Sequence, residues 1–311
     1  DRYSEATPDL VQAILEEAGK FNSAVIEPLR RSGDQQGSKL VNGVVETPEG
    51  FKAAYARYVE GGWGALSADP DFGGQGLPLT LSSAFMEMIS SANMAFGLCP
   101  MLSQGAVEAL RAHATPELQA RYLPNLVSGR WTGTMNLTEP QAGSDVGALR
   151  TRAVPQDDGS YRISGQKIFI TWGDHDVAEN VLHLVLARLP DAPAGTRGIS
   201  LFLVPKILVG EDGALGGRND LRVASLEHKL GIHASPTCVM AYGDNDGCVG
   251  YLIGEENKGM SCMFTMMNNA RLNVGLQGIG CAEMACQQAY AYAMERVQGR
   301  PVGAAQGAPI I

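Results

Sequence analysis

The hydrophobic pattern of this 311-residue chain changes its period twice. Up to about residue 130, apolar residues recur at the 3.6-residue spacing of a helix. From about Trp131 they form short runs of β-branched and aromatic residues, and from Met260 to about Val297 the helical period returns. Because helices and strands are segregated rather than alternating, a Rossmann-type sheet is disfavoured and the pattern predicts an α+β multidomain protein.

Three similar helix starts mark the first part of the chain. Thr7-Pro8-Asp9, Thr47-Pro48-Glu49 and Thr115-Pro116-Glu117 each offer a Thr N-cap, a Pro at the first helical position and an acid near the positive end of the helix dipole. The stretch from Thr80 to Phe96 indicates a further helix. We therefore expect an N-terminal all-helical domain over residues 1–133.

Strand signals dominate the second part. Tyr161–Ser164 and Lys167–Thr171 are short runs separated by Gly165-Gln166, which predicts a tight hairpin. Further strands are expected at residues 180–189, 198–205, 221–226, 237–242 and 249–253. Together they predict a middle antiparallel β-barrel-like domain over residues 134–255.

The last part predicts one long helix, along which Gly275, Gly278 and Gly280 would let another helix approach closely. A single helix with an apolar face cannot bury that face alone. We therefore expect residues 256–311 to be the first helix of a C-terminally truncated helical bundle, completed by residues absent from this chain or by another subunit.

Charge and composition exclude several classes of protein. The chain has 24 Lys and Arg against 33 Asp and Glu, a net charge of −9, which disfavours nucleic-acid binding. Its apolar runs are too short for a membrane span. The six cysteines form no C-x-x-C pair and indicate buried thiols in a reducing compartment. The histidine spacing fits no metal motif, so we expect no metal site.

One turn carries the clearest chemical signal. Gly143-Ser144-Asp145 offers free backbone N–H groups and a hydroxyl, which suit an anionic or carbonyl-rich ligand. The alternative is an ordinary turn with an Asx cap. The surrounding residues decide between them, because Leu137-Thr138-Glu139-Pro140-x-Ala142-Gly143-Ser144-Asp145 resembles the first signature of the acyl-CoA dehydrogenase family.

The resemblance continues in order over essentially the whole chain. Further family motifs are matched at residues 165–171, 227–232, 254–260 and 292–296. The chain is most similar to the bacterial branch that includes methylmercaptopropionyl-CoA dehydrogenases. The resemblance implies a helical domain, a β-barrel-like domain and a helical bundle.

The resemblance also implies an activity. Family members are FAD enzymes that oxidise an acyl-CoA thioester to its 2,3-enoyl form, by α-proton abstraction and β-hydride transfer to flavin N5. It further implies an acyl-CoA substrate, an electron-transfer flavoprotein as electron acceptor, a homo-oligomer and a location in the bacterial cytoplasm.

Carried over by position, the FAD-binding residues are Met135, Leu137, Thr138, Gly143, Ser144, Phe169, Ile170, Thr171 and Arg296. Phe169 would pack on the flavin ring, although it also reads as a strand core residue. Arg296 would cross a dimer interface to the neighbour's FAD pyrophosphate, although it also reads as an exposed helix arginine. For the substrate, the resemblance implicates Ser144, Arg271 and, in place of a family aspartate, Asn268.

A catalytic base is missing from the sequence. A minority branch of the family carries it at the position of Ala270, which cannot accept a proton. Glu139 lies within the first signature, where we expect it to order the loop. We therefore expect the base to lie outside this chain, and the fragment alone to be inactive and to retain FAD weakly.

Two other readings keep the family's fold. An acyl-CoA oxidase or a flavin monooxygenase would bring reduced flavin to oxygen, and the sequence does not separate these from a dehydrogenase. A non-catalytic binding protein, acting for instance on DNA, is disfavoured by the net charge.

Overall fold

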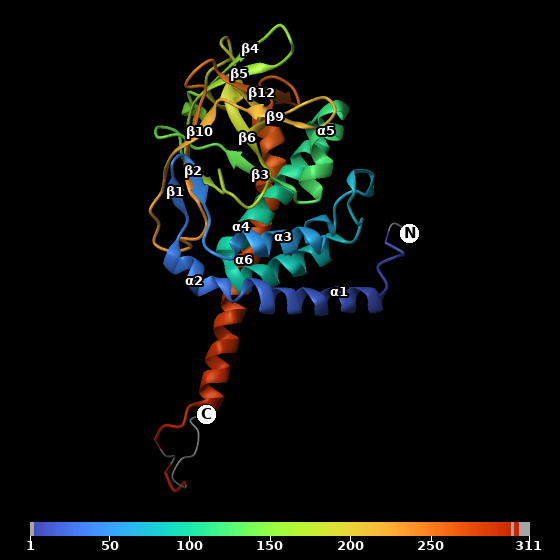
Figure 1. Cartoon of the computed structure of the whole chain (residues 1–311), viewed down its shortest axis with the longest axis vertical. Helices are drawn as coiled ribbons and strands as arrows, with labels where there is room; N and C mark the ends of the chain where they lie inside the picture. The colour runs from blue at the N-terminus through green and yellow to red at the C-terminus, as the bar shows by residue number, and fades with distance from the viewer. Residues whose placement is uncertain (1–2, 300–301, 305–311) are drawn as a thin grey trace.

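The computed structural model describes residues 3–299 and 302–304, so parts of the predicted segment 256–311, at 300–301 and 305–311, lie outside the described residues. Helices gather in the first part, strands in the second, and one long helix follows (Figure 1). The first part contains α1 (Pro8–Phe21), α2 (Leu29–Gln36), α3 (Phe51–Glu60), α4 (Leu79–His113) and α5 (Pro116–Val127), with a short hairpin of β1 (Lys39–Val41) and β2 (Val44–Glu46). The hairpin shows that this part is not entirely helical.

Two of the three predicted helix starts are confirmed. The Thr7 side chain accepts a hydrogen bond from the Leu10 amide at 3.3 Å, and α1 begins at Pro8. Thr115 caps α5 in the same way. In both helices the hydroxyl satisfies one of the amides that lack an intrahelical partner.

The third predicted start is wrong. Helix α3 begins at Phe51 after Gly50, whose backbone is left-handed with φ 87°. Thr47 instead donates from both its amide and its hydroxyl to Asp176 Oδ1, at 3.1 and 2.7 Å. Because the Thr47 hydroxyl is bonded to Asp176, it does not cap the helix. The bond instead connects the helical part of the chain to the strand-rich part.

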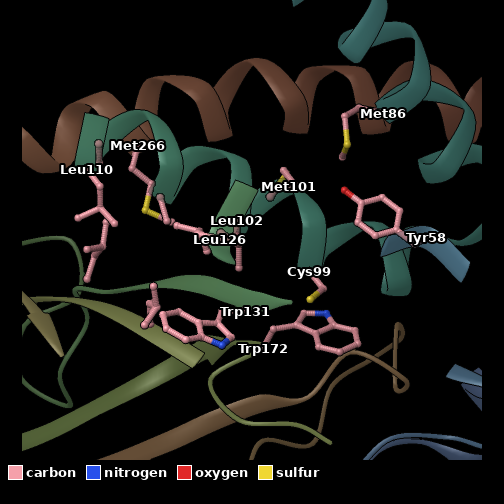
Figure 2. Close-up of a cluster of buried hydrophobic side chains, with 14 of the residues drawn as sticks. Tyr58, Met86, Cys99, Met101, Leu102, Leu110, Leu126, Trp131, Trp172 and Met266 are labelled. Carbon is pink, nitrogen blue, oxygen red and sulfur yellow. The ribbon is translucent and has the colours of Figure 1, made fainter. Parts of the chain in front are cut away.

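Helix α4 lies at the centre of the molecule. It is longer than the predicted 80–96 helix and bends at Asn93, whose φ and ψ of −160° and 91° are not helical. Its side chains pack against the long final helix on one side and against the start of the sheet on the other (Figure 2). The helix is apolar around most of its circumference, as a helix enclosed on several sides must be.

The main sheet has eight strands: β3 (Trp131–Asn136), β4 (Arg152–Pro155), β5 (Tyr161–Thr171), β6 (Asn180–Arg188), β7 (Ile199–Pro205), β10 (Leu221–Leu226), β11 (Thr237–Tyr242) and β12 (Cys248–Ile253). Strands β8 (Ile207–Val209) and β9 (Leu215–Arg218) form a separate pair. The order β10-β11-β5-β12-β7-β6-β3 has two ends, and β4 pairs with β5 and, at one position, with β6. The sheet is thus barrel-like without being a closed barrel.

The predicted strand arrangement needs two corrections. Most pairs are antiparallel, but β3 runs parallel to β6. Strand β4 also runs parallel to β6 at the one position where these two strands pair. The expected hairpin at Gly165-Gln166 does not form, because β5 runs unbroken through it. Gly165 lies at φ 147°, and a Cβ there would be 2.6 Å from Thr151 Oγ1. The glycine therefore serves a close backbone approach rather than a turn.

The final helix, α6 (Gly259–Glu295), confirms the predicted long helix. It packs against α4 as far as Gly280, and its C-terminal end extends beyond the rest of the molecule (Figure 1). The expectation of close approach holds at Gly280, where a Cβ would be 2.8 Å from the Glu87 carbonyl oxygen. Gly275 and Gly278 have no described atom within 4 Å of such a Cβ.

Three further observations concern the described residues as a whole. Within them, no helix is long and apolar enough to cross a membrane. No cluster of three or more His, Cys, Asp or Glu side chains within the described ranges is arranged to hold a metal ion. All six cysteines are free thiols, but the expectation that they are buried holds for four, since Cys281 is half-buried and Cys286 exposed.

The contact between α4 and β3 leads to a first prediction. A Cβ at Gly133 would lie 2.4 Å from the Cβ of Ala106, and both positions belong to elements that cannot move apart without opening the core. Gly133→Ala should therefore lower the free energy of unfolding by about 1–3 kcal/mol. Gly217→Ala is the matched control, because nothing lies within 4 Å of that position. Urea unfolding of both variants tests the difference, and equal stabilities would contradict the close contact.

Candidate active site

A pocket of about 460 Å³ opens where the ends of β3 and β5 meet α4 and α6. Its walls are mainly apolar, and among the described residues that line it Arg271 alone is charged. The lining residues are Leu102, Met135, Leu137, Thr138, Phe169, Ile170, Thr171, Met267, Ala270, Arg271 and Val274. The structure thus brings together six of the predicted cofactor residues and one predicted substrate residue, from segments far apart in the sequence.

Phe169 has the most unusual conformation in the pocket. Its backbone is left-handed, with φ 58°, and its side chain is 59% exposed. The cause is a β-bulge: Ile170 pairs with Cys238 and Lys167 with Met240, so two residues of β5 face one of β11. A bulky residue in this conformation is strained, and such strain is concentrated at functional sites. Phe169 lines the pocket and is exposed instead of joining the core, which contradicts its reading as a core residue.

The ends of the two strands are joined by hydrogen bonds. Thr134 donates from its hydroxyl to the Thr171 carbonyl oxygen at 2.7 Å, and the Ile168 amide donates to the Thr138 carbonyl oxygen at 2.9 Å. Among the described strands, β3 is also the last of the sheet, with β6 on one side only. Its other edge therefore lacks a strand partner where Met135 and Leu137 line the pocket.

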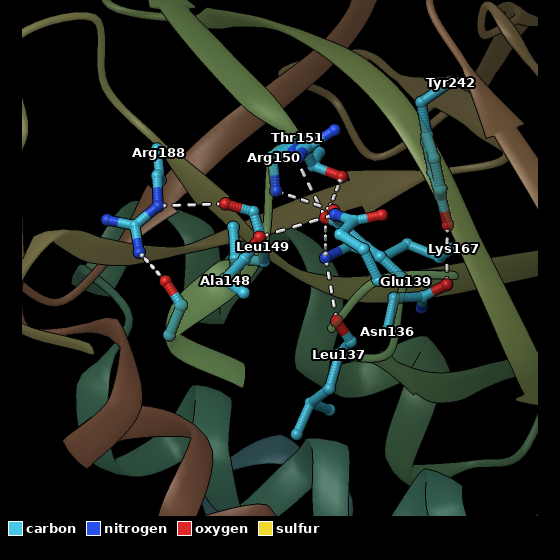
Figure 3. A network of polar contacts seen from close by, with 12 residues as sticks. Asn136, Leu137, Glu139, Ala148, Leu149, Arg150, Thr151, Lys167, Arg188 and Tyr242 are labelled. Carbon is cyan, nitrogen blue, oxygen red and sulfur yellow. Dashed lines mark hydrogen bonds and ion pairs between the residues drawn. The ribbon is translucent and has the colours of Figure 1, made fainter. Parts of the chain in front are cut away.

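Beneath this edge lies a buried ion pair between Lys167 and Glu139 (Figure 3). The Nζ and Oε1 atoms are 2.8 Å apart, and both side chains are almost fully buried. Lys167 also donates to the Leu137 carbonyl oxygen at 2.9 Å. Glu139 accepts further hydrogen bonds from the Arg150 amide and from both the amide and the hydroxyl of Thr151.

The protonation of the pair follows from these contacts. Burial opposes ionisation of Glu139, but the charge of Lys167 and the surrounding donors lower the pKa of its carboxyl to about 2. Burial lowers the pKa of Lys167 to about 8, against the opposing charge of Glu139. Both groups are therefore charged near neutral pH. A carboxylate so fully engaged orders the loop, as its place in the sequence predicts, and is unsuited to act as a base.

Four predicted site residues lie outside the pocket lining. Gly143 and Ser144 are exposed on the loop that follows Thr138. Asn268 is exposed on α6 and accepts a hydrogen bond from Arg271 at 3.1 Å. Arg296 is exposed directly after α6 and donates to Gln298 Oε1. Within this chain these side chains do not converge on the pocket.

Sequence reasoning missed several residues that build the site. Leu102, Met267 and Val274 complete the apolar walls, but no motif singled them out: two lie in the predicted long helix and Leu102 lies beyond the predicted 80–96 helix. Trp172 follows the pocket residues of β5, is buried, and donates from Nε1 to the Ala95 carbonyl oxygen at 3.1 Å. Its left-handed backbone, with φ 53°, continues the irregularity of the bulge. No spacing in the sequence could have revealed that conformation.

Comparison with known proteins identifies the fold and the motifs. The acyl-CoA dehydrogenase N-terminal domain matches residues 9–130, and the acyl-CoA dehydrogenase middle domain matches residues 134–244. The chain belongs to the acyl-CoA dehydrogenase family.

Relatives share the sequence at high identity. The 3-methylmercaptopropionyl-CoA dehydrogenase of Ruegeria pomeroyi is 55% identical over 99% of this chain and 52% of its own length. A butyryl-CoA dehydrogenase of Syntrophomonas wolfei is 44% identical over 93% of this chain and 49% of its own length. The chain thus spans about half the length of these relatives.

Solved structures share the fold. Butyryl-CoA dehydrogenase of Megasphaera elsdenii superposes with a TM-score of 0.78 at 24% identity, covering 95% of this chain and 72% of that one. A chain from a structure of the electron transferring flavoprotein of Acidaminococcus fermentans gives a TM-score of 0.77 at 26% identity, covering 95% and 71%.

The ion pair leads to a second prediction. Glu139→Gln removes the counter-charge that opposes the effect of burial on Lys167, so the lysine must either stay charged without a partner or lose its proton, and the free energy of unfolding should fall by about 3–5 kcal/mol at pH 7. The double variant Glu139→Gln/Lys167→Met should lose less, because no buried charge is left unpaired. Asp244→Asn is the control: it breaks an exposed pair with Arg222 and should cost about 1 kcal/mol at most.

The same pair predicts a pH dependence. The pKa of Glu139 is about 2 in the folded chain against an ordinary value of 4.5. Its contribution is therefore complete above about pH 4.5 and is lost as the pH falls towards 2. The stability difference between wild type and Glu139→Gln should shrink across that window, as measured by urea unfolding. A constant difference would contradict the assignment of the charge to Glu139.

Proposed function

We propose that this chain carries the FAD site and part of the acyl-CoA site of an FAD-dependent acyl-CoA dehydrogenase. The observation that carries the proposal is the single pocket that unites the ends of β3 and β5 with Arg271 of α6. The reaction would convert an acyl-CoA thioester to its 2,3-enoyl form.

The pocket residues fit a flavin. An isoalloxazine ring has flat apolar faces and a polar edge, and the pocket pairs an exposed aromatic ring at Phe169 with hydroxyls at Thr138 and Thr171. The unpaired edge of β3 supplies backbone groups beside Met135 and Leu137. We infer that Phe169 packs on the ring, that these polar groups bond its edge, and that Ile170 lies beside them.

When bound, FAD supplies the acceptor for the hydride that leaves the β-carbon. The chain's own residues would hold the acyl group against the apolar walls, which exclude water, and Arg271 would attract an anionic part of the substrate. None of the described residues that line the pocket carries a carboxylate, and Ala270 has no titratable group. We therefore propose that the base that removes the α-proton comes from outside this chain.

The remaining assignments are proposals of the same kind. Gly143 and Ser144 would contact the FAD pyrophosphate, with Ser144 also near the pantetheine arm, and Asn268 would contact CoA. Arg296, exposed and far from this pocket, would serve the FAD of a second subunit in a homo-oligomer. We further propose an electron-transfer flavoprotein as electron acceptor and a location in the bacterial cytoplasm. The names of the bacterial relatives support the substrate class.

The proposal is tested on the product of the complete reading frame that contains these residues. We expect the purified protein to show a flavin absorption spectrum that bleaches when an acyl-CoA is added without oxygen. Reoxidation by an electron-transfer flavoprotein or a dye, rather than by oxygen, would identify a dehydrogenase. A protein without flavin, or one whose flavin no acyl-CoA reduces, would overturn the proposal.

Phe169 gives a prediction that separates stability from function. Phe169→Gly relieves the left-handed strain while it removes the ring, so it should raise the free energy of unfolding by about 1 kcal/mol and still weaken FAD binding. Phe169→Ala is the matched control, because it removes the ring but keeps the strained Cβ. Urea unfolding of the FAD-free protein and FAD titration measure the two effects. Unchanged FAD affinity in both variants would contradict the role of the ring.

A further inference from the structure

The pocket edge of β3 is held from behind by a second polar cluster. Side chains alternate between the two faces of a strand, so Met135 lines the pocket while Asn136 points to the opposite face. Asn136 is fully buried there, together with His183 of β6 and Tyr242 of β11. Three strands therefore meet at one point directly behind the pocket wall.

The contacts within this cluster are specific. Tyr242 donates from its hydroxyl to Asn136 Oδ1 at 2.7 Å (Figure 3), and Asn136 donates from Nδ2 to His183 Nδ1 at 3.3 Å. The Tyr242 oxygen lies 3.1 Å from the same Nδ1, and the two rings meet edge-on. Both polar atoms of the Asn136 side chain are thus engaged.

These contacts define the protonation of the cluster. The hydroxyl proton of Tyr242 goes to Asn136, and an amide nitrogen can only donate, so Nδ1 of His183 accepts and its ring proton lies on Nε2, which is buried and has no hydrogen-bond partner among the described residues. Burial, with the nearby charge of Lys206, lowers the pKa of His183 to about 3, which agrees with a neutral ring. The cluster therefore keeps the same hydrogen bonds across the physiological pH range.

The cluster and the ion pair act on consecutive residues. Asn136 is held by its side chain, and the next residue, Leu137, is held by its carbonyl oxygen, which accepts from Lys167. Thr138 follows, with its carbonyl bonded to Ile168. Because β3 pairs with β6 alone among the described strands, these contacts add to the single ladder that holds it.

We propose that Asn136, His183 and Tyr242 are positioning residues, which set where the Met135–Thr138 backbone meets bound FAD. The inference rests on the proposed function for the identity of the ligand. It also has a consequence that does not depend on FAD: loss of the cluster should loosen the backbone amides of residues 135–138.

Tyr242→Phe tests the proposal, because it removes one hydroxyl and no ring. Tyr55→Phe is the matched control: that hydroxyl is also buried and donates to a backbone carbonyl, of Gly129, at 2.9 Å in the helical part of the molecule. Each variant loses one buried hydrogen bond, so each should lower the Tm by about 2–4 °C. In the Tyr242 variant alone we expect FAD affinity to fall about tenfold and amide exchange to quicken over residues 135–138.

Two variants of His183 test whether a hydrogen-bond acceptor at this position is enough to keep FAD affinity. His183→Asn keeps an acceptor close to the position of Nδ1 and should retain most of the FAD affinity, whereas His183→Leu should lose it as Tyr242→Phe does. Measurements use the full reading-frame product, stripped of flavin and titrated with FAD.

The outcomes separate the two proposals. If wild type binds FAD but Tyr242→Phe matches Tyr55→Phe in FAD affinity and in exchange at residues 135–138, the cluster is merely structural and the inference fails alone. If wild type binds no FAD, the proposed function fails, and the assignment of these residues to FAD fails with it. Faster exchange and weaker FAD binding confined to the Tyr242 and His183→Leu variants would support the inference.

Discussion

The pocket depends on the buried ion pair between Lys167 and Glu139. One partner lies on β5 and the other on the loop after β3, so the pair fixes the two strands that form the pocket wall relative to each other. Removing two charges from water is costly, and the cost is met here because almost every lone pair of Glu139 has a donor. A shift of either strand would break this set of contacts as a whole. The pair therefore favours one arrangement of the two strands over all alternatives.

The core supports this arrangement from below. Helix α4 is buried between α6 and β3, and at Gly133 the backbone of β3 comes close enough to Ala106 to exclude a side chain. The apolar floor of the pocket at Leu102 belongs to the same helix. The hydrophobic packing of α4 thus sets the depth of the pocket, while the polar contacts of β3 and β5 set its rim. Neither contribution would produce the site without the other.

Much of the fold was predictable because it rests on local patterns. The change of period located the helices and strands, and the strands at 221–226 and 237–242 have the predicted bounds. The predictions failed where a distant contact overrides a local signal. Asp176 takes the hydroxyl of Thr47 away from capping, and the approach of Thr151 to Gly165 turns an expected hairpin into continuous strand.

The site was predictable to a different extent. Part of its lining came from the resemblance of motifs, and six of the nine proposed cofactor residues do meet in one pocket. The residues that hold the pocket lining in place could not be predicted, because nothing in the sequence near Asn136 reveals that its hydrogen-bond partners are His183 and Tyr242. Hydrogen-bond partners that are brought together only by sheet topology leave no spacing to recognise. The left-handed backbone of Phe169 is of the same kind, since it arises from the register between two strands.

The parallel pairing of β3 with β6 has a consequence for how the protein folds. Trp131 pairs with Asn180, and the other pocket walls come from residues as distant as Leu102 and Val274. Closing such long loops is entropically costly and slows folding, so contacts of this kind form only as the chain approaches its native topology. The pocket as a whole therefore joins segments that are far apart in the sequence. A partly folded chain would therefore contain helices and strands but no binding site, and any ligand of the pocket would stabilise only the fully assembled protein.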